Sequence, residues 1–150
     1  GACPIWADGV SRGWMHGMPQ AMQDLADTKG LRTTNGSRLL AEWVPSYDCL
    51  MVARMKAAGC SVIGKTNAPE FGLGSHTFND VFGTTRNALD HSRAAGGSSG
   101  GAAVALATNM LPVADGSDYM GSLRNPAAWN GIYGLRPSQG RLPAWPESDV

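Results

Sequence analysis

Serine hydroxyls on glycine-rich backbone are the groups in this sequence best suited to chemistry. Ser98 and Ser99 lie in the run GGSSGG, directly before an alanine-rich segment, and Ser122 lies in a second run, GSDYMGS. A serine hydroxyl can attack a carbonyl carbon, and neighbouring backbone N–H groups can stabilise the oxyanion that forms. The two runs therefore predict either acyl transfer by a serine or a binding loop.

A reactive serine needs a base, and the three histidines do not supply one. Gly96–Gly100 fits the G-x-S-x-G pattern of a nucleophile elbow, but that fold needs an Asp and then a His after the serine. His16, His76 and His91 all precede Ser98, and the S-x-x-K pattern of β-lactamases does not occur. The histidines also lack the spacing of metal ligands, so we expect loop or surface positions for them and no metal site.

Two phosphate-binding alternatives can be weighed against a serine enzyme. The backbone N–H groups of GGSSGG could cradle an anion at a helix start. Gly59–Thr66 also matches the P-loop pattern G-x-x-x-x-G-K-T. A true P-loop follows a strand and opens a helix at its lysine, whereas here a helical pattern comes first and 61–63 reads as a strand. Nucleotide binding is therefore disfavoured.

Alternating strand and helix patterns surround both serine runs. We expect a helix over 46–59, capped by Ser46 and ended by Gly59, and a buried helix over 101–109 because that run is uniformly apolar. A helical turn is expected before Pro126. A turn into a short strand is expected over 17–24, and strands are expected over 60–64, 111–116 and 131–137. This order predicts an α/β fold with a mixed, mainly parallel sheet flanked by helices, whose strand ends carry the site.

Composition limits the classes of protein that this chain can belong to. It has 150 residues, of which only 16% are charged, well below the roughly 25% of an average soluble domain, so a piece of a larger body is expected. A formal net charge of zero argues against nucleic-acid binding. Three cysteines without a C-x-x-C pair argue for a reducing, cytoplasmic setting. No secretory signal and no membrane-length apolar run is visible.

Six blocks in order resemble the amidase signature family. They are GMPQAMQD, GKTNAPEFG, GTTRNALD, GGSSGG, GSDYMGSLRNPA and GLRPSQGRLP, between about residues 17 and 143. Members of that family are much longer than this chain. The resemblance therefore implies that residues 1–150 form one partial domain, the amino-proximal part of the family's α/β sandwich.

The resemblance also implies roles for individual residues. Ser122 would be the nucleophile that forms an acyl-enzyme, and Ser98 would be the bridging serine that follows a non-proline cis peptide bond. Ser99 and Arg124 would brace the two loops, with Ser99 also among the substrate-binding residues. The backbone N–H groups that resemble the oxyanion hole belong to Tyr119, Met120, Gly121 and Ser122.

One position departs from the family pattern in a way that affects the chemistry. Gln23 stands where the resemblance places the catalytic lysine, and a glutamine amide cannot take a proton as a neutral lysine can. The other lysines, Lys29, Lys56 and Lys65, are no obvious substitutes. Bulky side chains at positions 119 and 120, where many relatives have small ones, also predict an altered acyl pocket.

Three functions remain open from the sequence. The first is an amidase-type hydrolase of a small-molecule carboxamide or ester, weakened or inactive because of Gln23. The second is a non-catalytic remnant or interaction fragment of an amidase, and the third is an amidotransferase-like subunit that releases ammonia from glutamine. We expect no cofactor, no nucleic-acid or membrane partner, and association either with itself or with a missing second half.

Overall fold

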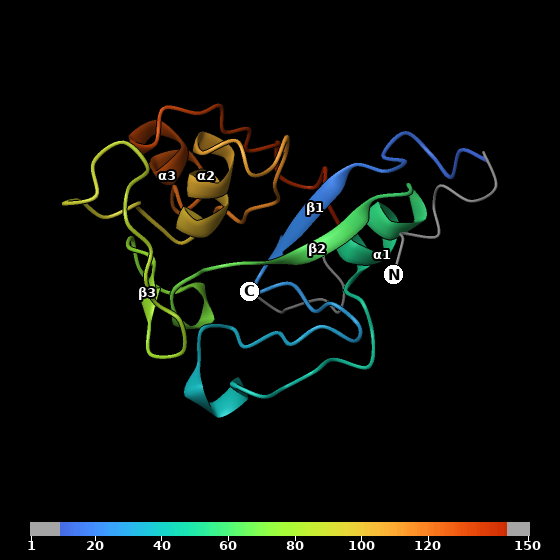
Figure 1. The fold of residues 1–150 in the computed structure, drawn as a ribbon, viewed down its shortest axis with the longest axis horizontal. Helices are drawn as coiled ribbons and strands as arrows, with labels where there is room; N and C mark the ends of the chain where they lie inside the picture. Colours follow the sequence, from blue (N-terminus) through green and yellow to red (C-terminus); the bar gives the residue numbers. More distant parts are fainter. Residues whose placement is uncertain (1–9, 144–150) are drawn as a thin grey trace.

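A short parallel sheet between helices forms the centre of the molecule (Figure 1). The computed structural model describes residues 10–143. Strands β1 and β2 run side by side, and two further strands form a small antiparallel ladder. The elements are β1 (Pro19–Gln23), α1 (Leu50–Ala57), β2 (Ser61–Thr66), β3 (Phe78–Asn79), β4 (Gly83–Thr84), α2 (Gly100–Ala107) and α3 (Arg124–Trp129), with 3-10 turns at Arg38–Leu40 and Glu70–Gly72.

The predicted strands over 17–24 and 60–64 are confirmed as β1 and β2. Their parallel register starts at Pro19 opposite Ser61 and ends at Gln23 opposite Thr66, with an irregularity between Gln20 and Ala21. Helix α1 connects them, as parallel strands require a crossover. The α/β class expected from the sequence is therefore present, and β1 delivers Gln23 to the strand end where the predicted site lies.

Successive residues of β1 face two different helices, because side chains alternate across a strand. Met22 is fully buried and belongs to a cluster with Val52 of α1 and with Cys60. Ala21 packs in a second cluster with Ala105 of α2 and with Leu111. The sheet thus lies between α1 and α2, and Gln23, two residues after Ala21, shares the α2 side.

The helix over 46–59 is shorter than predicted. Helix α1 begins at Leu50, its N-cap is Cys49, and Ser46 does not cap it. The reason is that the preceding residues are bound to the 24–31 loop: Cys49 N–H donates to Asp27 O (2.9 Å), and Asp48 accepts from Lys29 N–H (2.7 Å). The expected end is correct, since Gly59 follows the helix with φ +96°.

The buried helix expected over 101–109 is confirmed as α2, in which Ala102, Ala103 and Ala105 are buried. The strands expected over 111–116 and 131–137 are wrong, because both segments lack ladder hydrogen bonds. Their apolar residues satisfy a strand pattern, but among residues 10–143 no neighbouring strand pairs with them.

The helical turn expected before Pro126 instead continues through it as α3, which starts at Arg124. Proline is tolerated there because the N–H groups of a first helical turn have no intrahelical acceptor. The P-loop match over Gly59–Thr66 forms no loop, because Ser61–Thr66 is strand β2. No helix in the described part of the chain is long and apolar enough to cross a membrane.

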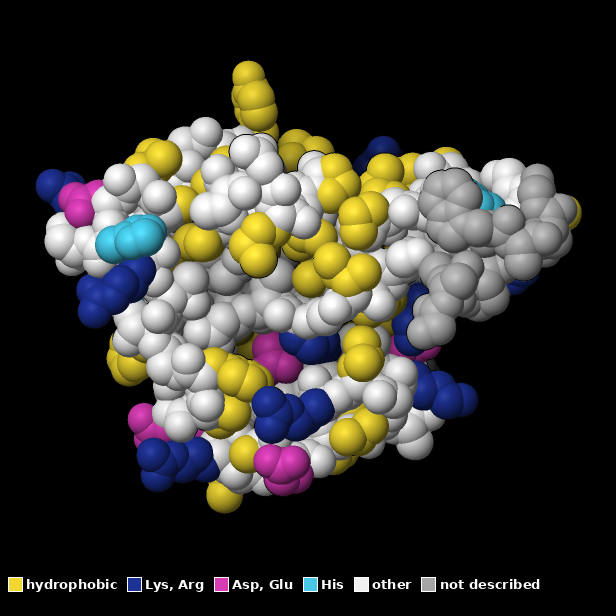
Figure 2. Space-filling view, viewed as in Figure 1, with side chains coloured by type: hydrophobic (Ala, Val, Ile, Leu, Met, Phe, Trp, Pro, Cys, Tyr) yellow, Lys and Arg dark blue, Asp and Glu magenta, His cyan; other side chains and the backbone are white. Residues whose placement is uncertain are grey.

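Charged and apolar side chains are unevenly distributed over the surface. Figure 2 shows hydrophobic side chains over the upper part of the face drawn, and charged side chains gathered mainly in the lower part, around the loops below the sheet in Figure 1. Cys49 and Cys60 carry free thiols, while Cys3 lies outside the described residues. In the portion that the structure describes, no group of three or more His, Cys, Asp or Glu side chains could hold a metal ion.

Candidate active site

The two serine runs meet in space. Ser99 N–H donates to Ser122 O (3.0 Å), which joins the two loops directly. The Ser99 hydroxyl adds two bonds to the second loop, accepting from Ser117 N–H (3.1 Å) and donating to Ser117 O (3.2 Å). The peptide bond between Gly97 and Ser98 is cis, as the resemblance implies.

Ser98 and Ser122 line the same pocket, which has a volume of about 750 Å³. Ser98 is almost fully buried and Ser122 is partly buried. The first loop has no room for a side chain at Gly97, because a Cβ there would lie 2.7 Å from the backbone nitrogen of His76. The other lining residues are Leu25, Phe71, Gly72, Leu73, Gly74, Ser75, Ser117, Tyr119, Met120 and Asn125.

Gln23 reaches this pair of loops from the end of β1. Its side-chain N–H group donates to Ser99 Oγ (3.1 Å) and to Ser98 O (3.4 Å), and its Oε1 accepts from Ser117 Oγ (3.2 Å). The side chain is buried. The position that the resemblance assigns to the base therefore lies beside both serine loops, but its occupant is an amide that holds them together.

Lys65 does not replace the missing lysine at this place. Its ammonium group donates to Ala26 O and to the hydroxyls of Thr28 and Thr33 (both 3.0 Å), and so fixes the loop after β1. Burial lowers the pKa of this lysine, partly offset by the nearby carboxylates of Asp24 and Asp115. Lys65 does not line the pocket of the two serines, which agrees with its structural interpretation from the sequence.

Asp118 organises the loop that carries Ser122, a role that the sequence did not predict although Asp118 lies in the block GSDYMGSLRNPA. Its carboxylate accepts from the backbone N–H groups of Gly121 (2.7 Å) and Leu123 (3.3 Å), and it binds Arg124 through two side-chain nitrogens at 2.9 and 3.0 Å. Chiefly because of the Arg124 bond, the pKa of Asp118 lies well below its usual range. Its position four residues before the serine was the available signal.

The four N–H groups expected in the oxyanion hole are not equivalent. The Gly121 N–H is engaged by Asp118, whereas within residues 10–143 no acceptor binds those of Tyr119, Met120 and Ser122. Gly121 has φ +104°, and a Cβ there would lie 2.8 Å from the Asn125 amide. A glycine is therefore required at this turn.

Asp115 is a second carboxylate that sequence reasoning missed. It accepts from the backbone N–H of Gln23 with both oxygens, at 3.1 and 3.2 Å, and so ties β1 to the segment before the nucleophile loop. Burial raises the pKa of this carboxyl, and the Gln23 hydrogen bond opposes that shift. A charged residue directly after the apolar pair Val113 and Ala114 was the signal in the sequence.

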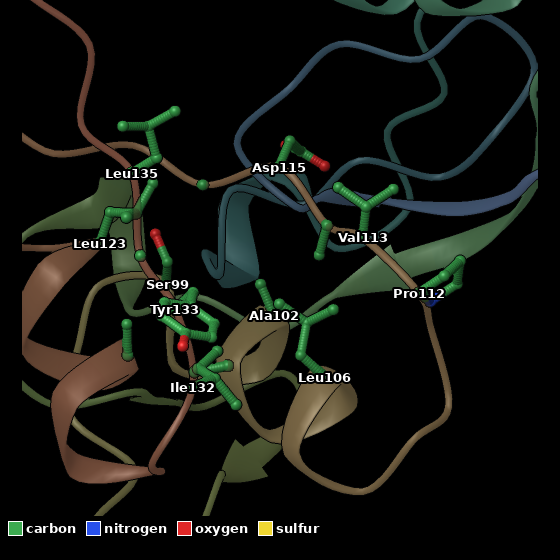
Figure 3. Close-up of a pocket in the computed structure, with 15 residues that line it drawn as sticks. Ser99, Ala102, Leu106, Pro112, Val113, Asp115, Leu123, Ile132, Tyr133 and Leu135 are labelled. Carbon is green, nitrogen blue, oxygen red and sulfur yellow. The ribbon is translucent and has the colours of Figure 1, made fainter. Parts of the chain in front are cut away.

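A second, apolar hollow of about 320 Å³ is lined in part by Ser99. Figure 3 shows side chains of α2, of the 112–115 segment and of the 132–135 segment around it. The two segments that the sequence predicted as strands form part of its wall. The hollow contains neither Ser98 nor Ser122, so it is not the candidate active site.

Comparison with known proteins places the chain in a family. A family model described as Amidase matches residues 6–150, and the chain belongs to the amidase signature family. A glutamyl-tRNA(Gln) amidotransferase subunit of Thermus thermophilus is 53% identical over 126 residues, which are 84% of this chain and 27% of that protein. The chain spans about a quarter of the length of the curated relatives it matches.

Solved structures of amidase signature enzymes share the fold. The corresponding glutamyl-tRNA(Gln) amidotransferase subunit of Thermotoga maritima superimposes with a TM-score of 0.80 at 44% identity, covering 83% of this chain and 28% of that one. The peptide amidase of Stenotrophomonas maltophilia gives a TM-score of 0.81 at 38% identity, covering 87% and 28%. The predicted fold class and family are therefore confirmed.

Proposed function

We propose that this chain supplies the nucleophile-bearing part of an amidase-type hydrolase that acts on a small-molecule carboxamide or ester, with activity weakened by Gln23. One observation carries the proposal: Ser98 and Ser122 line a single pocket on loops joined by the bond from Ser99 N–H to Ser122 O. Membership of the amidase signature family supports the same reaction class.

In the proposed reaction, Ser122 Oγ attacks the carbonyl carbon while its proton passes to the Ser98 hydroxyl. The oxyanion is stabilised by the N–H groups of Tyr119, Met120 and Ser122, which have no acceptor within the described residues. The C–N or C–O bond then breaks, and the leaving group departs with the hydroxyl proton that Ser98 gives up after taking the one from Ser122. Water attacks the acyl ester on Ser122: its oxygen and one hydrogen leave with the acid, and its other hydrogen returns to Ser122 Oγ.

Gln23 interrupts the proton path of this reaction. Its amide holds Ser99 and Ser117 but neither accepts nor releases a proton near neutral pH. The hydroxyl of Ser98 then has no base behind it, so attack by Ser122 is slow. In this proposal the placement of the nucleophile is kept, whereas its activation is weakened.

A serine-directed aryl fluorophosphonate tests the nucleophile. We expect the purified chain to be labelled at Ser122, located by peptide mass spectrometry, and expect no labelling of the Ser122→Ala variant or of the heat-unfolded chain. Ser92→Ala, at an exposed serine outside the pocket, is the matched control and should label normally. Absence of native-state labelling would favour a non-catalytic remnant instead.

A second candidate is an amidotransferase-like subunit that releases ammonia from glutamine. It is favoured by the amidotransferase relatives, of which the Thermus protein is 53% identical. This function predicts ammonia release from glutamine that depends on added partner subunits of such a relative.

The cytoplasmic location inferred from the cysteines also stays a prediction. It is in keeping with the free thiols of Cys49 and Cys60.

A further inference from the structure

The wall of the Ser98–Ser122 pocket is formed by apolar side chains from three separate segments. Leu25 follows β1, Phe71 and Leu73 come from the turn after β2, and Tyr119 and Met120 come from the nucleophile loop. Exposed fractions are 77% for Leu73, 84% for Tyr119 and 83% for Met120. Exposed apolar groups gathered around a polar floor are typical of a ligand groove.

Two observations show that specific packing and hydrogen bonding hold this wall in place. The Leu25 side chain packs so closely on Gly72 that a Cβ there would lie 2.8 Å from Leu25 Cδ1. Phe71 has φ +51°, a conformation that aromatic residues rarely adopt, and its N–H donates to Asn35 O (2.7 Å). Strained backbone of this kind is often retained at binding sites.

The charges nearest to the wall in the sequence are all engaged elsewhere. Asp24, before Leu25, accepts from the N–H and hydroxyl groups of Thr34. Glu70, before Phe71, accepts from the Ser37 hydroxyl (2.6 Å). Asp118, before Tyr119, is held in its ion pair with a side-chain exposure of only 3%. No charged side chain of residues 10–143 lines the pocket.

We propose that this pocket selects a carboxamide or ester whose substituent is uncharged and apolar, several carbon atoms long, and that it discriminates against charged amides such as glutamine. The proposal rests on the hydrolase function proposed above. An apolar substituent would cover Leu73 and Met120 and remove them from water, which is favourable. A charged substituent would lose water without gaining a partner, which is costly.

Binding to an inert variant tests this selectivity independently of any reaction. The 15N-labelled Ser122→Ala chain is titrated by NMR with hexanamide, with the same six-carbon amide ending in an ammonium or a carboxylate, and with L-glutamine. We expect hexanamide to bind about tenfold or more tightly than each charged amide, with shifts at Leu73, Tyr119 and Met120. Equal or tighter binding of the charged amides would overturn the proposal.

Two exposed leucines provide a matched pair of variants. Leu73→Ser removes a wall side chain and should weaken hexanamide binding by about threefold to tenfold, as expected for loss of a few buried methylene groups. Leu89 is similarly exposed, at 73%, but does not line the pocket, so Leu89→Ser should bind hexanamide as the parent does. If both variants weaken binding equally, the wall does not select the substituent.

Labelling separates failure of this inference from failure of the proposed function. With fluorophosphonates that carry an ethyl or an octyl group, we expect the octyl probe to label Ser122 about tenfold faster. If both probes label Ser122 at the same rate, the proposal that Ser122 is the nucleophile stands and the proposed selectivity is overturned. Selective hexanamide binding without labelling by either probe would overturn the hydrolase and leave an apolar amide-binding pocket.

Discussion

In the proposed reaction, Gln23 is the side chain on which activation of Ser122 depends. Its amide group bonds to oxygen atoms of Ser98, Ser99 and Ser117. Ser98 O and Ser99 Oγ, which accept from the Gln23 amide, would equally accept from an ammonium group, whereas Ser117 Oγ donates to the amide oxygen. We therefore infer that an amine at position 23 would find hydrogen-bond acceptors in place, although an amide occupies the position.

We predict that Gln23→Lys raises the rate at which Ser122 is acylated. A positioned base contributes about 10²–10⁴-fold to such steps, so the gain should fall in that range. The measurement is the initial burst of p-nitrophenol from p-nitrophenyl hexanoate. Gln23→Met is the control, since it has similar length and no proton acceptor, and it should show no gain. If the Lys and Met variants react at the same rate, the third catalytic group lies elsewhere.

Asp118 controls the loop through its charge. The folded-state pKa of its carboxyl is lower than that of the unfolded chain, so ionisation stabilises the fold above about pH 4. That contribution is lost as the pH falls toward the folded-state pKa. We predict that Asp118→Asn lowers the free energy of unfolding at pH 7 by about 1.5–3 kcal/mol, the usual worth of hydrogen bonds to a charged group.

Urea unfolding of the Asp118→Asn variant between pH 7 and pH 2.5 checks this. The variant should lose less stability than the parent as the pH falls, because the acid-sensitive group is gone. Asp80→Asn is the control: Asp80 is 77% exposed, its pair with Arg38 is 3.5 Å long, and it should change little. An unchanged acid dependence in Asp118→Asn would show that this carboxylate does not stabilise the loop.

At the scale of elements, local sequence patterns correctly predicted the helices and strands whose structure depends on residues nearby in the sequence. Strands β1 and β2 and helix α2 follow from apolar runs and from glycine boundaries. The start of α1 was missed because Asp48 and Cys49 bind the 24–31 loop, a contact that no local pattern encodes. Strands over 111–116 and 131–137 were predicted from apolar content alone, which cannot show whether a pairing strand exists.

The residues of the candidate site also fall into those that local sequence patterns predict and those that they do not. The two serine runs and the unusual Gln23 were found from the sequence, because glycine-flanked serines and ordered blocks are visible without a structure. Leu25, Phe71 and Leu73 were not found, because they lie on loops whose place beside the serines is fixed only by tertiary contacts. Asp115 was not found because its partner is the backbone of β1, more than 90 residues earlier.

Close packing of α2 against the loop after β2 gives a prediction for that helix. A Cβ on Gly101 would lie 2.4 Å from the nitrogen and 2.6 Å from the oxygen of Asn67, both backbone atoms. Although alanine favours helices, we predict that Gly101→Ala destabilises the fold by about 1–3 kcal/mol, as overpacking does. Gly64→Ala, with no atom within 4 Å, is the control. The free energy of unfolding is measured with urea. If it falls equally in the two variants, α2 can shift away from Asn67.

At the scale of the whole molecule, large apolar side chains are exposed beside α2. Around the hollow in Figure 3, exposed fractions are 103% for Tyr133, 83% for Leu135 and 42% for Val113. The adjoining segments 111–116 and 131–137 also form no helix or strand. Surfaces of this kind are associated with contacts between chains.

We therefore predict that the isolated chain associates with itself through the α2 side. Size-exclusion chromatography with light scattering, run over a hundredfold range of concentration, should show mass increasing from monomer toward dimer or larger species. Leu135→Ser should shift this transition to higher concentration, because it removes exposed apolar area at the hollow. Leu142→Ser, at an exposed leucine outside the hollow, is the control and should leave it unchanged. A monomer at every concentration, or equal effects of the two variants, would mean that the apolar surface beside α2 does not drive association.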